Sequence, residues 1–167
     1  SGAVESETIK ALGAVAIGMP VTEVPEAISR GTIDGTTSHP APLVDFGISR
    51  VTSAHYFTRL GVVPLAMLMN RKKFESLPKP AQDAIRKYSG EWTAARFNQG
   101  IGEYNASVVK QLQADPKRKV VFPSQADLDA MQPAFQSVID GWVSKSPRNK
   151  ELLTIVRDEL ANIRAGR

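Results

Sequence analysis

Two histidines and the polar residues beside them are the side chains of this sequence best suited to chemistry. His39 follows Ser38, and Asp34 is close in sequence, so a hydrolytic triad can be drawn from them. Such a triad needs a hydroxyl within hydrogen-bond reach of a base that a third group orients. Neighbouring Ser38 and His39 on a tight loop rarely meet that requirement, and no G-x-S-x-G nucleophile elbow is present. The sequence therefore predicts that the protein is not an enzyme.

Metal and cofactor sites find little support in the same residues. Neither His39 nor His55 belongs to an H-x-x-x-H array, the nearby carboxylates do not repeat at ligand spacing, and there is no cysteine. Gly13 and Gly18 are too sparsely set for a dinucleotide fingerprint. We expect no metal and no cofactor, and we interpret His55, beside Tyr56, as a packed histidine or part of a cleft wall.

The composition is that of a globular protein, with 42% hydrophobic and 23% charged residues in 167. The net charge of +4 raises the possibility of nucleic-acid binding. The basic clusters at 71–73 and 117–119 are short, however, and no aromatic residues are interleaved with them. We interpret both as solvated loop or helix-end charges and expect no nucleic-acid partner.

Residues 10–35 predict a strand, a capped helix and a second strand. The first apolar run is Ala14 to Ile17, and Thr22 is placed to cap a following helix, whose buried stripe begins at Val24. Gly31 stands where a left-handed residue ends such a helix, and a second strand begins at Thr32. A plain crossover helix without any ligand would give the same pattern.

The order of residues in this segment carries a more specific resemblance. KALGAVAIGMPVTEVPEAISRGTIDG, residues 10–35, resembles the signature of the DctP-like solute-binding receptors of tripartite ATP-independent periplasmic (TRAP) transporters. Similarity to that family continues through Val51-Thr52 with His55, Leu68-Met69-Asn70, Phe74 and Leu77-Pro78. The resemblance is specific through residue 92, and the remaining chain is compatible with it only in pattern.

Further elements follow from apolar periodicity and from capping residues. We expect the following: a helix from Val4 to Leu12 ending at Gly13, a helical turn at 43–46, strands at 49–59, 62–69 and 120–122, a short helix from Asn70 to Leu77, and C-terminal helices after Ser124 and from 150 to 164. Pro133 is expected to kink or interrupt the first of these C-terminal helices.

The strongest helical pattern runs from Pro80 to about Ala114, a length of roughly 50 Å at 1.5 Å per residue. Two apolar stripes, rotated relative to one another, meet near Gly100. Two helices broken near Gly100 would explain the stripes. The resemblance implies instead one continuous helix that spans two lobes, and that is our prediction.

The resemblance implies an α/β fold with periplasmic-binding-protein-like lobes. The expected organisation is a ligand-binding lobe over residues 1–66, a hinge strand and the lobe-spanning helix over 67–114, and C-terminal helices over 115–167. The N-terminal half of a two-lobe receptor, made as a precursor with a signal peptide, is expected to precede Ser1. In the family, an arginine that clamps the ligand carboxylate lies in that preceding part.

The function that the resemblance implies is capture of a small organic acid in the periplasm and its delivery to the membrane subunits of a TRAP transporter. The ligand-binding positions carried over are Val21, Thr37, Ser38 and His39. This sequence departs from the common family pattern at Val21, where an aromatic is frequent, and at Ser38 and His39. A capped turn before Pro40 is the structural alternative for those two residues.

Two other functions stay open, and one assembly state is expected. The first alternative is a small periplasmic α/β hydrolytic enzyme using Ser38, His39 or His55, and the second is a fragment that binds a protein. Incomplete lobes expose apolar surface, so self-association as a homodimer through residues 62–69 or the long helix is expected.

Overall fold

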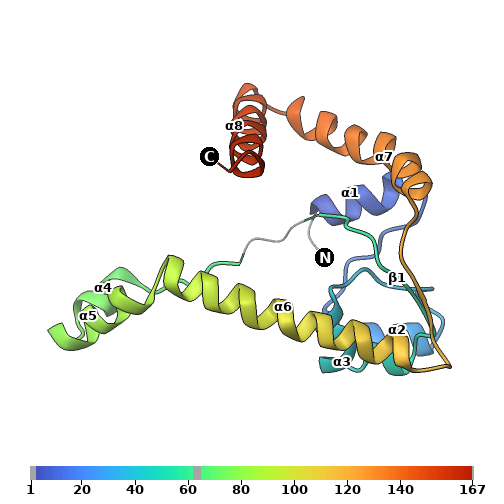
Figure 1. Ribbon diagram of the computed structural model, residues 1–167, viewed down its shortest axis with the longest axis horizontal. Coiled ribbons are helices and arrows are strands. Elements are labelled where there is room, and N and C mark those ends of the chain that lie inside the picture. The colour runs from blue at the N-terminus through green and yellow to red at the C-terminus, as the bar shows by residue number, and fades with distance from the viewer. Residues whose placement is uncertain (1–2, 62–64, 167) are drawn as a thin grey trace. The chain divides into compact units, whose positions relative to one another are not determined.

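The computed structural model describes residues 3–61 and 65–166 (Figure 1). Helices and a small parallel sheet confirm the α/β class. The elements, in chain order, are α1 (Ala3–Ala11), η1 (Val21–Glu23, a 3₁₀ turn), α2 (Val24–Ser29), α3 (Pro40–Asp45), η2 (Ile48–Arg50, a 3₁₀ turn), β1 (Ala54–Tyr56), α4 (Arg71–Glu75), α5 (Lys79–Tyr88), α6 (Glu91–Ala114), β2 (Lys119–Val121), α7 (Gln125–Val143) and α8 (Pro147–Arg164).

The chain divides into two compact units. One comprises residues 1–20, 58–60 and 122–167, and contains α1, α7 and α8. The other comprises residues 21–57 and 61–121, and contains α2 to α6, both 3₁₀ turns and both strands. We call the first the α7 unit and the second the α6 unit, and each is described by itself.

Glycine ends α1 and α2 as the sequence predicts. Gly13 has φ +87° and Gly31 has φ +69°, values that favour a residue without Cβ. After α2, the Gly31 N–H donates to the Ile28 carbonyl at 3.0 Å and the Thr32 N–H donates to the Ala27 carbonyl at 2.9 Å. This pair of bonds is a Schellman motif, which satisfies the last carbonyls of the helix.

The sheet of the α6 unit consists of β1 and β2, paired in parallel. His55 lies opposite Val120, and the ladder continues beyond the strands through Lys119 N–H to the Ser53 carbonyl and Phe57 N–H to the Val121 carbonyl, both 2.8 Å. Parallel neighbours need a long crossover, and α4, α5 and α6 supply it. The predicted strands at 49–59 and 120–122 are therefore real, although the first is reduced to three residues.

Three other predicted strands differ from the structure. Residues 14–17, 32–33 and 65–69 form no strand, and residues 62–64 of the third lie outside the described part. Val15 and Leu68 are 87% and 88% exposed, so the apolar runs are not buried either. A strand exists only with a hydrogen-bonding neighbour, and within the described residues none of the three segments has one.

The predicted continuous helix from Pro80 to Ala114 is wrong at its N-terminal third. The helix stops at Tyr88 and a new one starts at Glu91, because Gly90 has φ +64° and ψ −135°, a conformation that only glycine adopts readily. Gly100, where the alternative placed the break, lies inside the 24 residues of α6. A glycine costs a helix about 1 kcal/mol relative to alanine, too little to end one that packs against α3.

The α7 unit is built on capped helices. Ser124 Oγ accepts from the Asp127 N–H, and the Asp127 carboxylate accepts from the Ser124 N–H, a complete capping box at the predicted residues. The helix continues through Pro133 to Val143, so of the two predicted effects of this proline, a kink or an interruption, the interruption is wrong. α7 contacts both α1 and α8, and α8 begins at Pro147, three residues earlier than predicted.

Candidate functional site

The first predicted ligand-binding residue, Val21, opens the 3₁₀ turn that leads into α2. Its side chain is 38% exposed, so an apolar contact surface is available there. The predicted cap Thr22 lies inside this turn; the N-cap residue is Glu23, and its side chain makes no capping bond. Pro25 near the start of α2 removes one amide that a cap would otherwise serve, which explains why the cap is dispensable.

The other three, Thr37, Ser38 and His39, lie in the irregular segment between α2 and α3. Thr37 is half-buried, whereas Ser38 and His39 are exposed. Ser38 Oγ donates to the His39 carbonyl at 3.0 Å. His39 is the N-cap residue of α3, in an extended conformation with ψ 165°, and its imidazole makes no capping bond. Hydroxyl and imidazole groups offer donors and acceptors suited to a polar ligand.

The same geometry speaks against the hydrolytic triad. Among the described contacts, the Ser38 hydroxyl bonds to the main chain of His39 and to no imidazole nitrogen. A serine nucleophile must lie within hydrogen-bond reach of its base. Ser38 and His39 are therefore not arranged as a nucleophile and base.

Two adjacent residues of α6 hold the short helix that follows these residues. Asn105 Oδ1 accepts from the Ala41 N–H at 2.9 Å, near the start of α3. Tyr104 Oη donates to Asp45 Oδ1 at 2.6 Å, at the end of α3. Neither contact was predicted from the sequence. The available signal was Asn105, a polar residue three and seven positions before Val108 and Leu112, the buried side chains of α6.

His55 is a packed histidine, as predicted. Its side chain is 9% exposed at the middle position of β1, and burial together with the Arg118 guanidinium lowers its pKa below the usual 6.5. Its Nε2 atom has no hydrogen-bond partner among the described residues. Burial and the nearby guanidinium both favour the neutral imidazole, which suits a core position.

Arg118 corrects the interpretation of the basic cluster at 117–119. Its side chain is only 19% exposed, and its guanidinium donates to the carbonyls of Ser49 and Thr52 and to the Asp115 carboxylate. The bonds to Asp115 and Thr52 measure 2.8 and 2.9 Å. Arg118 therefore ties the start of β2 to the turn before β1, and it is not a solvated loop charge.

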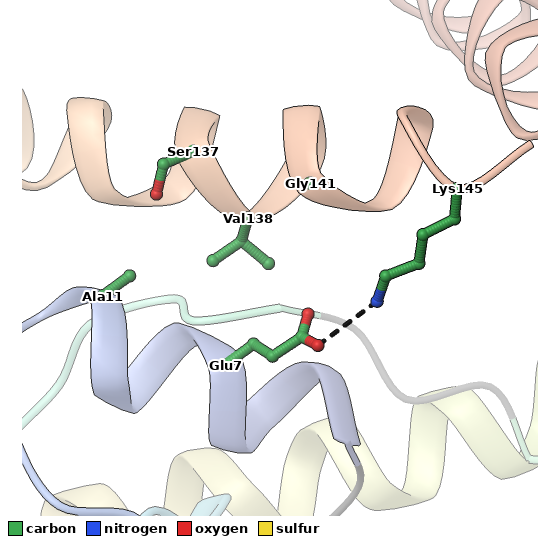
Figure 2. A pocket seen from close by; sticks show the side chains of 6 residues that line it. All are labelled: Glu7, Ala11, Ser137, Val138, Gly141 and Lys145. Atoms are coloured by element: carbon green, nitrogen blue, oxygen red, sulfur yellow. Dashed lines mark hydrogen bonds and ion pairs between the residues drawn. The ribbon is translucent and has the colours of Figure 1, made fainter.

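A shallow pocket lies between α1 and α7 in the other unit (Figure 2). It has a volume of about 250 Å³, and a Glu7–Lys145 ion pair of 3.3 Å closes one side. Figure 2 shows Val138 of α7 facing Glu7 of α1, with Ala11 farther along α1. None of the four predicted binding residues lines it.

The described part of the chain offers neither a metal-binding cluster nor a membrane-spanning helix. Residues 3–61 and 65–166 contain no group of three or more His, Cys, Asp or Glu side chains that could hold a metal ion. No helix within those same ranges has the length and apolar character needed to cross a membrane.

Comparison with known proteins supports the resemblance. The family model of bacterial extracellular solute-binding protein, family 7, matches residues 2–146. A solute-binding protein of Chromohalobacter salexigens is 24% identical over 152 residues, which cover 91% of this chain and 44% of that relative. The chain thus spans less than half the length of this curated relative.

The family match includes the whole segment of residues 10–35 and all four predicted binding residues. Together with the helices and the parallel sheet, it agrees with part of a periplasmic-binding-protein-like lobe. The resemblance predicted from the sequence is confirmed, and the chain belongs to family 7 of the bacterial extracellular solute-binding proteins.

Proposed function

We propose that this chain forms part of a periplasmic receptor that captures a small organic acid and delivers it to the membrane subunits of a TRAP transporter. The match of residues 2–146 to a solute-binding family is the observation that carries this proposal. The relative's printed name, a solute-binding protein, agrees with it. In this function the protein binds and releases its ligand without covalent chemistry.

Val21, Thr37, Ser38 and His39 are the proposed ligand contacts. Val21, Ser38 and His39 are exposed, and the Ser38 and His39 side chains can donate hydrogen bonds to a carboxylate. All four belong to the α6 unit, where the segment that bears them runs from the start of η1 to the start of α3. A firmly attached scaffold for polar groups is typical of small-molecule sites.

The isolated chain is expected to bind weakly. The resemblance implies an arginine that clamps the ligand carboxylate, and no arginine of residues 1–167 stands at the matching position. A hydrogen bond to a charged group contributes about 1.5–3 kcal/mol, so losing that contact weakens binding by about ten- to a hundredfold.

The binding test compares this chain with the complete gene product that contains it. Isothermal titration calorimetry with acetate, lactate, succinate and glutarate should give tight binding of at least one acid by the complete product. Ser38→Ala and His39→Ala should each weaken it by about two- to tenfold, the effect of one lost neutral hydrogen bond. Ser29→Ala, at an exposed residue at the end of α2, is the matched control. Tight binding by the isolated chain, or unchanged affinity in both variants, would place the main anchor elsewhere.

We also propose that the isolated chain self-associates as a homodimer. Leu65, Met67 and Leu68 are 77%, 92% and 88% exposed, and Trp92 and Phe97 of α6 are about half exposed. Exposed apolar groups of this size favour association. Light scattering over a concentration series should show a dimer, and a monomer at every concentration would contradict the proposal.

A further inference from the structure

We propose that Asn105 is a positioning residue of the binding site, which holds the backbone that carries Ser38 and His39. The proposal rests on the proposed function of those two residues. Asn105 belongs to α6, 64 residues after Ala41, and its Oδ1 atom accepts from the Ala41 N–H at 2.9 Å. Ala41 is buried and Asn105 is half-buried, so water competes less for the bond than it would at an exposed site.

The start of α3 explains why a residue from another helix is needed there. The first amides of a helix have no partner within the helix. Pro40 has no N–H, so the Ala41 amide is the first one that requires an acceptor. The ordinary acceptor is the N-cap side chain, yet His39 makes no such bond. Asn105 satisfies this amide, and the His39 imidazole is not used for capping.

A second contact fixes the other end of α3. Tyr104, the neighbour of Asn105, donates through Oη to Asp45 at 2.6 Å, and this bond raises the pKa of the Tyr104 hydroxyl. Ala41 and Leu43 of α3 and Val108 of α6 are buried as well. Figure 1 shows α3 lying along the C-terminal half of α6. The helix is thus attached at both ends and through its buried face.

The consequence concerns the two residues just before Ala41. His39 lies two positions and Ser38 three positions before the held amide, at 3.8 Å between successive Cα atoms. A loop that is ordered before the ligand arrives loses less conformational entropy on binding. Asn105 therefore supports affinity through the geometry of Ser38 and His39, without touching the ligand itself.

The contact can be tested directly in the unmodified 167-residue chain by NMR. A scalar coupling across the hydrogen bond should connect the Ala41 amide nitrogen with the Asn105 side-chain carbonyl carbon. This measurement requires no variant to fold. Absence of the coupling in a spectrum that shows the backbone couplings of α6 would overturn the proposal.

Variants then separate positioning from mere stability. Asn105→Ala should speed hydrogen exchange of the Ala41 amide by about five- to tenfold, as expected for one lost hydrogen bond, and should shift the His39 imidazole resonances. Asn105→Asp keeps an acceptor oxygen and should restore both readouts. Asn98→Ala, at an exposed residue of the same helix, should change neither. Unchanged His39 resonances in Asn105→Ala would show that Asn105 has only a structural role.

Measuring succinate binding by the same variants distinguishes the positioning role of Asn105 from the proposed organic-acid function. In the complete gene product, with succinate as the probe, Asn105→Ala should weaken binding by about two- to tenfold and Asn105→Asp should restore it. If succinate and the other acids bind to no variant, the organic-acid function fails while the NMR readouts still decide the role of Asn105. If succinate binds equally to all variants, the positioning role is wrong while the proposed function stands.

Discussion

The two units treat their apolar residues differently. Among the described residues, the buried apolar side chains all belong to the α6 unit: Val24, Ala41, Leu43, Ile48, Val108 and Leu112. In the α7 unit, the apolar face of α8 stays open, and its five large side chains, Leu152, Ile155, Val156, Leu160 and Ile163, are 37–68% exposed. Val108 and Leu112 of α6 and the five residues of α8 all recur at the spacing of a buried helix stripe. Spacing indicates that a face suits burial, but the partner that covers it has to come from elsewhere.

The contrast bears on function because the predicted ligand contacts lie in the unit with the core. Val21 and residues 37–39 adjoin α2 and α3, whose side chains Val24, Ala41 and Leu43 are buried. Functional groups are positioned most precisely on such rigid supports. We therefore expect the α6 unit to dominate both stability and ligand contact.

The largest expected difference is between an isoleucine of the core and one of the open face. Ile48 is 0% exposed and Ile155 is 50% exposed. Ile48→Ala should lower the free energy of unfolding by about 2–5 kcal/mol, because it removes buried methylene groups and leaves a cavity. Ile155→Ala should change it by no more than about 0.5 kcal/mol. Urea unfolding followed by circular dichroism measures both, and equal losses would show that the open face of α8 is covered in solution.

Arg118 gives the next largest effect. Arg118→Met removes charged donors from the Ser49 and Thr52 carbonyls and should cost about 1.5–3 kcal/mol of unfolding free energy. Arg118→Lys keeps the charge but lacks the planar fork, so its loss should be intermediate. Lys117→Met changes an exposed neighbour and serves as the control in the same urea titrations. A loss in Arg118→Met no larger than in Lys117→Met would contradict the structural role of Arg118.

The lowered pKa of His55, in the core of the α6 unit, predicts that the free energy of unfolding depends on pH. Its pKa in the folded protein lies below the unfolded value of 6.5, because burial and Arg118 disfavour the imidazolium. The unfolded state therefore binds more protons below pH 6.5, and the stabilising contribution of neutral His55 is lost as the pH falls from that value toward the folded pKa.

The urea midpoint of the wild type should accordingly fall more steeply between pH 7.5 and 5 than that of His55→Gln. His39→Gln alters an exposed histidine and should follow the wild type. Parallel pH profiles for the wild type and His55→Gln would contradict the assignment of a lowered pKa.

The smallest expected effect compares two helix starts. Ser124→Ala removes an observed capping bond of α7 and should cost about 0.5–2 kcal/mol. Thr22→Ala should cost almost nothing, because Thr22 caps no helix in this structure. Thermal unfolding of both variants decides between these outcomes, and a larger loss in Thr22→Ala would restore the cap predicted from the sequence.

Local signals in the sequence predicted most helix ends correctly. Gly13, Gly31, Asn70 and Ser124 each act within a few residues of their own position, so their roles depend little on the remaining fold. Strands were predicted less well. Residues 14–17 and 65–69 have strand-like composition, but pairing depends on a neighbour that local sequence does not contain.

The candidate site divides in the same way. The family resemblance predicts residues 21 and 37–39 from their order along the chain. The Asn105–Ala41 and Arg118–Thr52 bonds join residues more than 60 positions apart, and only the tertiary structure brings them together. The break at Gly90 was missed because glycine inside a helical pattern is usually tolerated, and only its positive φ distinguishes a break from a weak point.

Hydrogen exchange with mass spectrometry tests the central claim most directly. The complete gene product would be compared without ligand and with the carboxylate that calorimetry shows to bind best. We predict that ligand slows exchange in the peptides containing residue 21 and residues 37–41, and leaves those of α8 unchanged. Protection confined to α1, α7 and α8, with none at residues 37–41, would contradict the assignment of the binding site to the α6 unit.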